Sequence, residues 1–313
     1  MKLLIINNPN SGYQNGTIFD FIRSAADEDT EITLRTIGPN TTTDELLADA
    51  DNFDVVIPSG GDGTVCSVAY RLLNTGIKVM PFPAGTSNAL AMNLMSPDEP
   101  HALAKLVKQG RTMDFDMGEL SAGEEKHGFS LVAGCGYDAT IMQSAQDTKA
   151  KLGPMAYFHA AFSNPTPTQA HFIITVDGET IERDGLSVLV ANFSKMQFEL
   201  ALTHENLPRD GLLDIMVLKT PNALGLIPAF ITTWLDRSGG FPDRGEGVET
   251  FRGKEISIVS DPPLPIQYDG EPTELTTPAT FSLIPKSIRY VVSQACAEHY
   301  YDESEDGPLA QED

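Results

Sequence analysis

The chain has 313 residues, of which 41% are hydrophobic and 21% are charged, as expected of a packed protein with room for two domains. Its formal net charge of −23 argues against nucleic acid as a partner, because contacts to phosphate need clustered Lys and Arg. The first residues, MKLLIINNPN, are too few for a signal peptide or a membrane span, and no apolar run of about 18 residues follows. Three scattered cysteines argue against a disulfide framework and a zinc site, so we expect a cytoplasmic protein.

Strands and helices alternate in the first part of the chain. The expected strands are residues 2–8, 31–37, 54–59 and 78–83. The expected helices are a weak pattern at 18–22 and clearer ones at 43–50, 65–73, within 84–94 and at 103–108. This alternation predicts a parallel sheet with helices on both faces, the doubly wound α/β class.

The pattern changes from Thr112 onward to short alternating runs that predict an antiparallel β-sandwich or barrel. The clearest runs are residues 171–176, 186–193, 212–218, 255–260 and 279–284. Helical stretches interrupt them at about 138–163 and about 222–235. The second stretch is apolar nearly all round and holds Trp234, which is consistent either with core packing or with an apolar wall for a lipid.

These patterns divide the chain into an α/β domain at 1–118, a β-sandwich domain at 119–285 and a tail at 298–313. Residues 286–297 are a candidate last segment of the first domain, because IRYVV at 288–292 has the character of a strand. The last sixteen residues contain seven Asp and Glu and no Lys or Arg, which predicts a solvated acidic tail.

The sequence DVVIPSGGDGT at 54–64 carries the strongest chemical signal. A buried strand ends in a turn of Gly60, Gly61, Asp62, Gly63 and Thr64 that leads into a helix. Glycine lets the backbone approach an anion closely, and amides at a helix start donate to phosphate oxygens. A carboxylate in this loop would repel phosphate unless a metal ion or a proton transfer is involved.

Two other loops have similar composition, NPNSG at 8–12 and AGTSNAL at 84–90. Each combines Gly with Ser, Thr or Asn, and each follows a predicted strand. Because ligands of doubly wound sheets bind at the carboxyl ends of the strands, we expect the three loops to converge there. Together they predict a phosphate site built from amides and hydroxyls.

Eight motifs resemble the diacylglycerol kinase catalytic family, which includes bacterial lipid kinases, sphingosine kinases and ceramide kinases. They occur in the family's order from residue 5 to about residue 284, as NNPNSG, SGGDGT, PAGTSNALA, DFDMG, GCGYDA, LGPMAY, DGLLDI and YDGE. The resemblance implies an N-terminal domain like that of NAD kinase and phosphofructokinase, with lipid held by the β-sandwich. It also implies Mg²⁺-dependent transfer of phosphate from ATP to a lipid hydroxyl, peripheral contact with a membrane, and a capacity to pair as a homodimer.

The resemblance also assigns residues to these roles. The nucleotide would be bound by Asn8, Pro9, Ser11, Gly12, Thr36, Gly60, Gly61, Asp62, Gly63, Thr64, Gly85, Thr86 and Asn88. Glu271 of YDGE stands where the family has its proton acceptor, and Asp269 is the neighbouring candidate. Without the family context, the pair Asp269 and Gly270 predicts a type I′ or type II turn between two strands. Asp62 is a further candidate catalytic residue, either as the base or as an anchor for Mg²⁺.

Asp210 matches the family's structural magnesium site, where carbonyls three residues before and two after the Asp complete the ligands. In this chain those carbonyls belong to Leu207 and Leu212, and the alternative is an ordinary turn at Asp210 and Gly211. Asp116 and Asp138 also lie in matched motifs, and we expect them to fix loops at the domain junction by hydrogen bonding.

Departures from the family pattern leave two alternatives open. The first loop lacks the usual basic residue, and the third has Ala89 for Asp and Met92 for Arg. The chain could therefore be a non-catalytic nucleotide or lipid sensor. It could also phosphorylate a soluble substrate such as NAD, because NAD kinases share the GGDGT motif.

Overall fold

The computed structural model describes residues 1–12, 16–136, 168–193, 207–219 and 247–301. The expected helices at about 138–163 and 222–235, Trp234 and Asp138 lie outside these ranges. The elements of the α/β half are β1 (Lys2–Asn7), α1 (Thr17–Ala25), β2 (Glu31–Thr36), α2 (Thr43–Leu46), a 3₁₀ turn (Ala50–Asn52), β3 (Val55–Gly60), α3 (Asp62–Arg71), β4 (Lys78–Val79), β5 (Phe82–Pro83), α4 (Ala89–Asn93) and α5 (Pro100–Gln109).

The remaining described elements form the other half and the return to the first. They are β6 (Thr112–Ala122), β7 (Glu125–Phe129), β8 (Val132–Gly136), β9 (Ala170–Val176), β10 (Glu179–Gly185), β11 (Ser187–Ala191), β12 (Leu213–Leu218), β13 (Val248–Gly253), β14 (Glu255–Asp261), β15 (Pro265–Tyr268), β16 (Glu271–Thr276), β17 (Ala279–Val291) and α9 (Gln294–His299). None of the helices described is long and apolar enough to cross a membrane.

The N-terminal half is a doubly wound parallel sheet, as predicted. Strands β2, β1, β3 and β4 lie side by side and parallel. Leu3 and Ile5 of β1 pack into a core cluster with α1 and α5, whereas Leu4 and Ile6 pack into a second cluster with α3 and α4. Alternate residues of one strand are thus buried on opposite faces, which explains why these strands read as continuous apolar runs.

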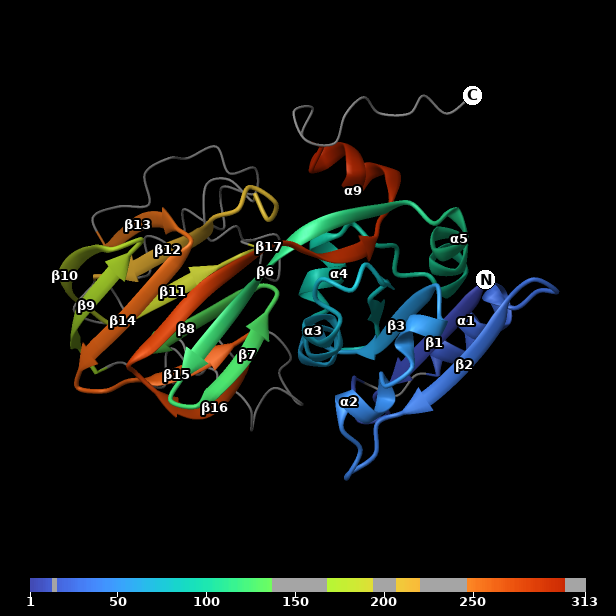
Figure 1. Ribbon diagram of the computed structural model, residues 1–313, viewed down its shortest axis with the longest axis horizontal. Coiled ribbons are helices and arrows are strands. Elements are labelled where there is room, and N and C mark those ends of the chain that lie inside the picture. Colours follow the sequence, from blue (N-terminus) through green and yellow to red (C-terminus); the bar gives the residue numbers. More distant parts are fainter. Residues whose placement is uncertain (13–15, 137–167, 194–206, 220–246, 302–313) are drawn as a thin grey trace.

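The C-terminal half is a β-sandwich, also as predicted. A six-stranded antiparallel sheet in the order β13-β12-β11-β8-β15-β16 faces the antiparallel part of the larger sheet across one shared core cluster. Strands β6 and β17 are paired over most of their length and belong to both halves, as Figure 1 shows. Residues 288–291 lie in β17, where Arg289 and Tyr290 pair in parallel with β4.

Three local expectations are corrected by the structure. The strand expected at 78–83 is two short strands, β4 and β5, separated by Met80 and Pro81, because proline cannot donate to the ladder. Helix α2 ends at Leu46 rather than near residue 50, although its capping box of Thr42 and Glu45 is present. The C-terminal tail does not begin at residue 298, because α9 runs to His299 and Tyr300 is buried.

Candidate functional site

The three glycine-containing loops meet at the carboxyl ends of β1, β3 and β5. A Cβ atom added at Gly12 would lie 2.1 Å from the carbonyl oxygen of Ala84, and one added at Gly85 would lie 2.3 Å from Cα of Gly61. Both distances are too short for any side chain, so backbone packs directly on backbone. The convergence expected from the sequence is therefore present.

Hydrogen bonds between the loops support the same arrangement. The Asn8 side-chain amide donates to Oγ1 of Thr64 at 2.9 Å, and the amide of Gly61 donates to Oγ of Ser11 at 3.3 Å. The first loop is thus fixed to the second through polar side chains. Of the other expected nucleotide-binding residues, Pro9, Thr36 and Thr86 are exposed.

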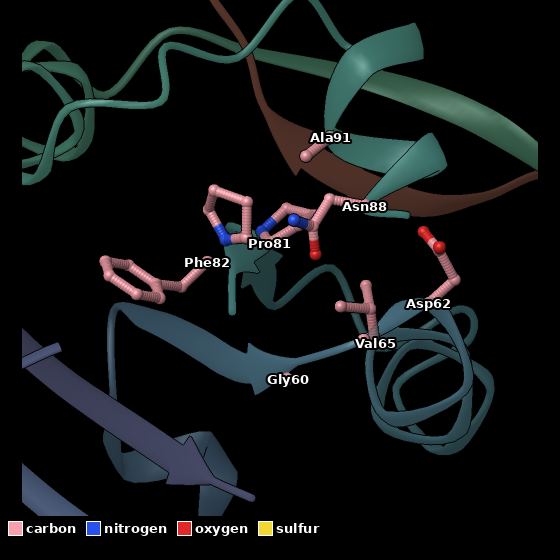
Figure 2. A pocket seen from close by; sticks show the side chains of 9 residues that line it. Gly60, Asp62, Val65, Pro81, Phe82, Asn88 and Ala91 are labelled. Carbon is pink, nitrogen blue, oxygen red and sulfur yellow. The ribbon is translucent and has the colours of Figure 1, made fainter. Parts of the chain in front are cut away.

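A small hollow of about 160 Å³ lies against the second and third loops (Figure 2). Gly60, Gly61 and Asp62 line it from the second loop, and Asn88 and Ala91 line it from the third loop and α4. The hollow therefore lies directly beside the backbone of the glycine loop.

Asn88 shapes the third loop. It has a positive φ of 49°, and its Oδ1 accepts from the Gly85 amide at 2.8 Å while its Nδ2 donates to the Gly85 carbonyl at 3.0 Å. These two bonds close the loop on itself. Asn88 thus holds the backbone of this loop in position beside the hollow.

Asp62 is the first residue of α3 and connects the second loop to α4. Its Oδ1 accepts from the amide of Leu90 at 2.9 Å, and its carboxylate points toward the start of α4 in Figure 2. The amides at the start of a short helix lack partners within that helix, so a carboxylate there is favourable.

Glu271 reaches the glycine loop from the sandwich half. It begins β16, directly after the two-residue turn of Asp269 and Gly270, whose φ values of 46° and 81° identify the type I′ alternative. A Cβ atom added at Gly63 would lie 3.4 Å from Cγ and 3.6 Å from Oε1 of Glu271. The exposed Glu271 side chain therefore lies over the first turn of α3, where the helix dipole is positive.

Asp269 has a different environment from Glu271. Its carboxylate accepts from three consecutive amides, those of Ser130 and Leu131 at 2.7 Å and that of Val132 at 3.1 Å. Burial raises the pKa of Asp269 to about 6, although the amide hydrogen bonds act in the opposite direction. Its carboxylate is occupied by the loop between β7 and β8, so it holds the hairpin that carries Glu271.

Asp116 fixes the domain junction, in agreement with the expectation from the sequence. Its Oδ1 accepts from the amide of Lys286 at 2.7 Å and its Oδ2 from the amide of Gly211 at 2.9 Å. Burial is the main cause that raises its pKa. The side chain ties β6 to β17 and to the segment that precedes β12.

The Asp210 segment has contacts that the sequence analysis missed. One carboxylate oxygen of Asp210 is bonded to the guanidinium of Arg252, and the other accepts from the amide of Leu212 at 3.1 Å. The carbonyl of Leu207 accepts from the amide of Asp210 at 3.4 Å. As arranged here, this donor set does not fit a metal ion, because a guanidinium already bonds to the carboxylate.

The donors around the glycine loop fit Mg²⁺ better. Asp62 and Glu271 offer carboxylate oxygens, which are the ligands that Mg²⁺ prefers. Among the described residues, no group of three or more His, Cys, Asp and Glu side chains could hold a metal by itself. An ion here would thus need phosphate oxygens and water as additional ligands, which is the usual manner of Mg²⁺ binding in kinases.

Two family models match the two halves of the chain. Residues 2–120 match the diacylglycerol kinase catalytic domain, and residues 131–292 match the YegS C-terminal NAD kinase beta sandwich-like domain. The boundary between them falls near β7 and β8, where the sandwich begins. Both halves therefore match in the order expected from the motifs.

Several curated proteins are similar over most of this chain. An uncharacterized protein of Synechocystis sp. is 30% identical over 77% of this chain, but the chain spans only 55% of that relative's length. A "Probable lipid kinase YegS-like" of Pectobacterium atrosepticum is 30% identical, covering 70% of this chain and 72% of the relative. A "Diacylglycerol kinase" of Mycobacterium tuberculosis is 29% identical, covering 77% of each.

Solved structures share the fold. A diacylglycerol kinase from Bacillus anthracis superposes with a TM-score of 0.70 at 24% identity, covering 94% of this chain and 97% of that one. An NAD kinase from Archaeoglobus fulgidus in complex with ATP superposes with a TM-score of 0.53 at 12% identity, covering 96% of each chain. These structures show the fold. The two matched family models and the 30% identity to the Pectobacterium protein show that the chain belongs to the diacylglycerol kinase catalytic family.

Proposed function

We propose that this protein is a lipid kinase that transfers the γ-phosphate of ATP to a lipid hydroxyl, with Mg²⁺. The observation that supports the proposal most is the position of Glu271, a carboxylate from the sandwich lying over Gly63 of the glycine loop. Phosphoryl transfer requires bound phosphates next to a group that accepts a proton from the attacking hydroxyl. Contact between the two halves at this point can satisfy both requirements.

Phosphate binding is assigned to the backbone of the converging loops. The first turn of α3 and the glycines around it offer amides without side chains to block an anion. Amides held rigidly by neighbouring backbone lose little entropy when a ligand binds. No basic side chain lies among the residues that line the hollow, so these donors would carry much of the binding.

Glu271 is the proposed base among the three candidate carboxylates. Asp269 accepts three amide hydrogen bonds within the sandwich, and Asp62 accepts one from Leu90. The oxygens of both carboxylates are engaged by protein amides, so they are less available to a substrate hydroxyl than those of Glu271. Glu271 is exposed next to the glycine loop, so it can reach a hydroxyl brought to the phosphate.

Asp62 is the proposed carboxylate anchor for Mg²⁺. When bound, the ion would neutralise charge on the phosphates during transfer. The hydrogen bond from Leu90 fixes the orientation of Asp62 before any ligand arrives. A carboxylate that is already fixed lowers the free-energy cost of organising the site around an ion.

A lipid acceptor implies contact with a membrane surface or with a lipid taken from it. Met92 on α4 is 46% exposed, beside Ala91, which lines the hollow. The exposed Met92 offers an apolar surface to an acyl chain, whereas the family usually has a charged arginine at this position. The names of the relatives from Pectobacterium and Mycobacterium point to the same class of substrate.

The direct test is phosphate transfer from radiolabelled Mg-ATP to dispersed diacylglycerol, sphingosine, ceramide and phosphatidylglycerol, with NAD as a soluble acceptor. We expect label in one of the lipids and none in NAD. Label in NAD alone would identify a soluble-substrate kinase. ATP binding by calorimetry without transfer to any acceptor would favour a non-catalytic sensor, and either result would refute the proposal.

A further inference from the structure

The segment from Leu207 to Leu212 is held in place by protein groups on several sides. Asp116 accepts from the amide of Gly211, and the amide of Asp116 donates to the carbonyl of Pro208 at 3.0 Å. The buried Arg209 donates to the carbonyls of Asp114 and Tyr300, both at 2.7 Å. The segment therefore connects β6, α9 and the start of β12 at the junction of the two halves.

Arg252 reaches this segment because of the strand register. It lies on β13 directly opposite Asp214 of β12, and its Nε donates to Asp214 Oδ1 at 2.8 Å. The same guanidinium bonds to Oδ2 of Asp210, which precedes β12 by a short turn. Opposite charges on directly paired residues are a recurrent source of sheet stability.

We propose that Arg252 is the resident cation of this segment and takes the place of the structural divalent ion that the family motif implies. A planar guanidinium can bond to two carboxylates at once, as Arg252 does with Asp210 and Asp214. A divalent ion at Asp210 would compete for the same carboxylate and would be repelled by the adjacent guanidinium.

The proposal separates two kinds of metal dependence. Folding and stability of the junction become independent of divalent ions, because the cation is covalently part of the chain. Any Mg²⁺ requirement then belongs to the reaction at the glycine loop. This inference concerns stability without nucleotide, so it stands or falls independently of the proposed kinase activity.

The first measurement is the thermal unfolding of the full chain without nucleotide, in EDTA and with MgCl₂, MnCl₂ or CaCl₂. An ion at about 100 times its Kd would raise the Tm by roughly 4 °C. We expect no such rise for the wild type. A rise that is lost in Asp210→Asn would place an ion at Asp210 and overturn the proposal, whereas a rise retained in that variant would come from another site and leave Arg252 as the cation here.

The second measurement removes the guanidinium. Arg252→Met leaves Asp210 and Asp214 without their cation, so we expect a lower Tm that is partly restored by one of the divalent salts. The double variant Arg252→Met with Asp210→Asn should lose that restoration. If Arg252→Met is folded and no salt changes its Tm, Asp210 is not a cation site and the proposal fails. If it does not fold, the wild-type thermal unfolding with and without divalent salts decides between the two cations.

Discussion

The two sides of the candidate site are built by opposite means. On the α/β side, Gly12 and Gly85 let three loops come together because they lack side chains. On the sandwich side, one side chain does the positioning, since Asp269 accepts three amides and thereby holds the turn that carries Glu271. Adding a methyl group to one of these glycines should therefore disrupt the α/β side of the site. Altering the carboxylate of Asp269 should disrupt the sandwich side.

Two residues that are close in the sequence, Asp269 and Glu271, have different surroundings in the structure. Asp269 and Glu271 are two residues apart, yet one is bonded within the sandwich and the other lies over the glycine loop of the other half. A tight hairpin turn makes this division possible, because it turns the chain between them. In the proposed reaction, proton transfer and positioning would thus fall to separate carboxylates.

The largest effect is expected for Glu271→Gln, which keeps the shape of the side chain and removes the base. Loss of a general base typically lowers kcat by about 10²–10⁴-fold. The measurement is lipid phosphorylation with Mg-ATP, with ATP binding followed by calorimetry. Glu274→Gln is the matched control, since Glu274 is exposed on the same strand, and it should retain activity. Equal activity of the two variants would remove Glu271 from the mechanism.

A smaller loss is expected for Asp269→Asn, because its amide nitrogen would face amide donors and the hairpin would shift. Misplacement of a reacting group by about 1 Å can cost about 10²-fold in rate. Asp177 is a close control: it has a φ of 50°, precedes Gly178 and accepts from the amides of Lys254 and Glu255. We expect Asp177→Asn to lower the Tm and leave kcat unchanged, while Asp269→Asn lowers both. Unchanged kcat in Asp269→Asn would contradict the positioning role.

The same variant gives a test based on pH. Burial raises the pKa of Asp269 to about 6, above the ordinary value of 3.8, so the folded protein keeps a proton that the unfolded chain has released between these values. The contribution of this carboxyl to the free energy of unfolding therefore falls as the pH rises through that window. Urea unfolding of wild type and Asp269→Asn at about pH 4 and about pH 6.5 should show their difference shrinking at the higher pH. A difference that grows would refute the raised pKa.

The smallest effect on catalysis is expected on the glycine side. In Gly12→Ala the new methyl would meet the Ala84 carbonyl, so the first and third loops must separate. Gly123→Ala is the matched control, because its φ of 61° nearly equals the 60° of Gly12 but nothing lies within 4 Å of the added atom. Both variants should carry the strain of a left-handed residue, about 1–2 kcal/mol. Only Gly12→Ala should weaken ATP binding, by about tenfold or about 1.4 kcal/mol. If both variants bind ATP equally well, close contact between the first and third loops is not required for nucleotide binding.

Local features of the fold could be predicted from the sequence. Apolar runs that stop at Pro9 and at Gly60 marked β1 and β3, and the Asp269-Gly270 pair marked a tight turn. Periodicity missed the first turn of α3, because Asp62, Gly63 and Thr64 have no apolar side chain to mark a buried face. Pro81 divided a predicted strand for a reason visible in the sequence.

Contacts between distant residues could not be predicted in the same way. The amides that bond to Asp269 are 137 to 139 residues away from it, and nothing in their sequence marks them as donors. Arg252 meets Asp214 only because β12 and β13 pair in one particular register. Register depends on the whole sheet, so a motif alone could not reveal the partner of Asp210.

The strands β6 and β17 give the molecule a mechanical property. In the described part of the chain, these two paired strands carry the backbone from the α/β half to the sandwich and back. Their register shifts between Ile284 and Ile288, where Lys286 has a φ of 43° and donates to Asp116. The two halves are thus joined by a hydrogen-bonded pair of strands with a register shift near Lys286. A movement of Glu271 toward or away from the glycine loop would require β6 and β17 to bend together.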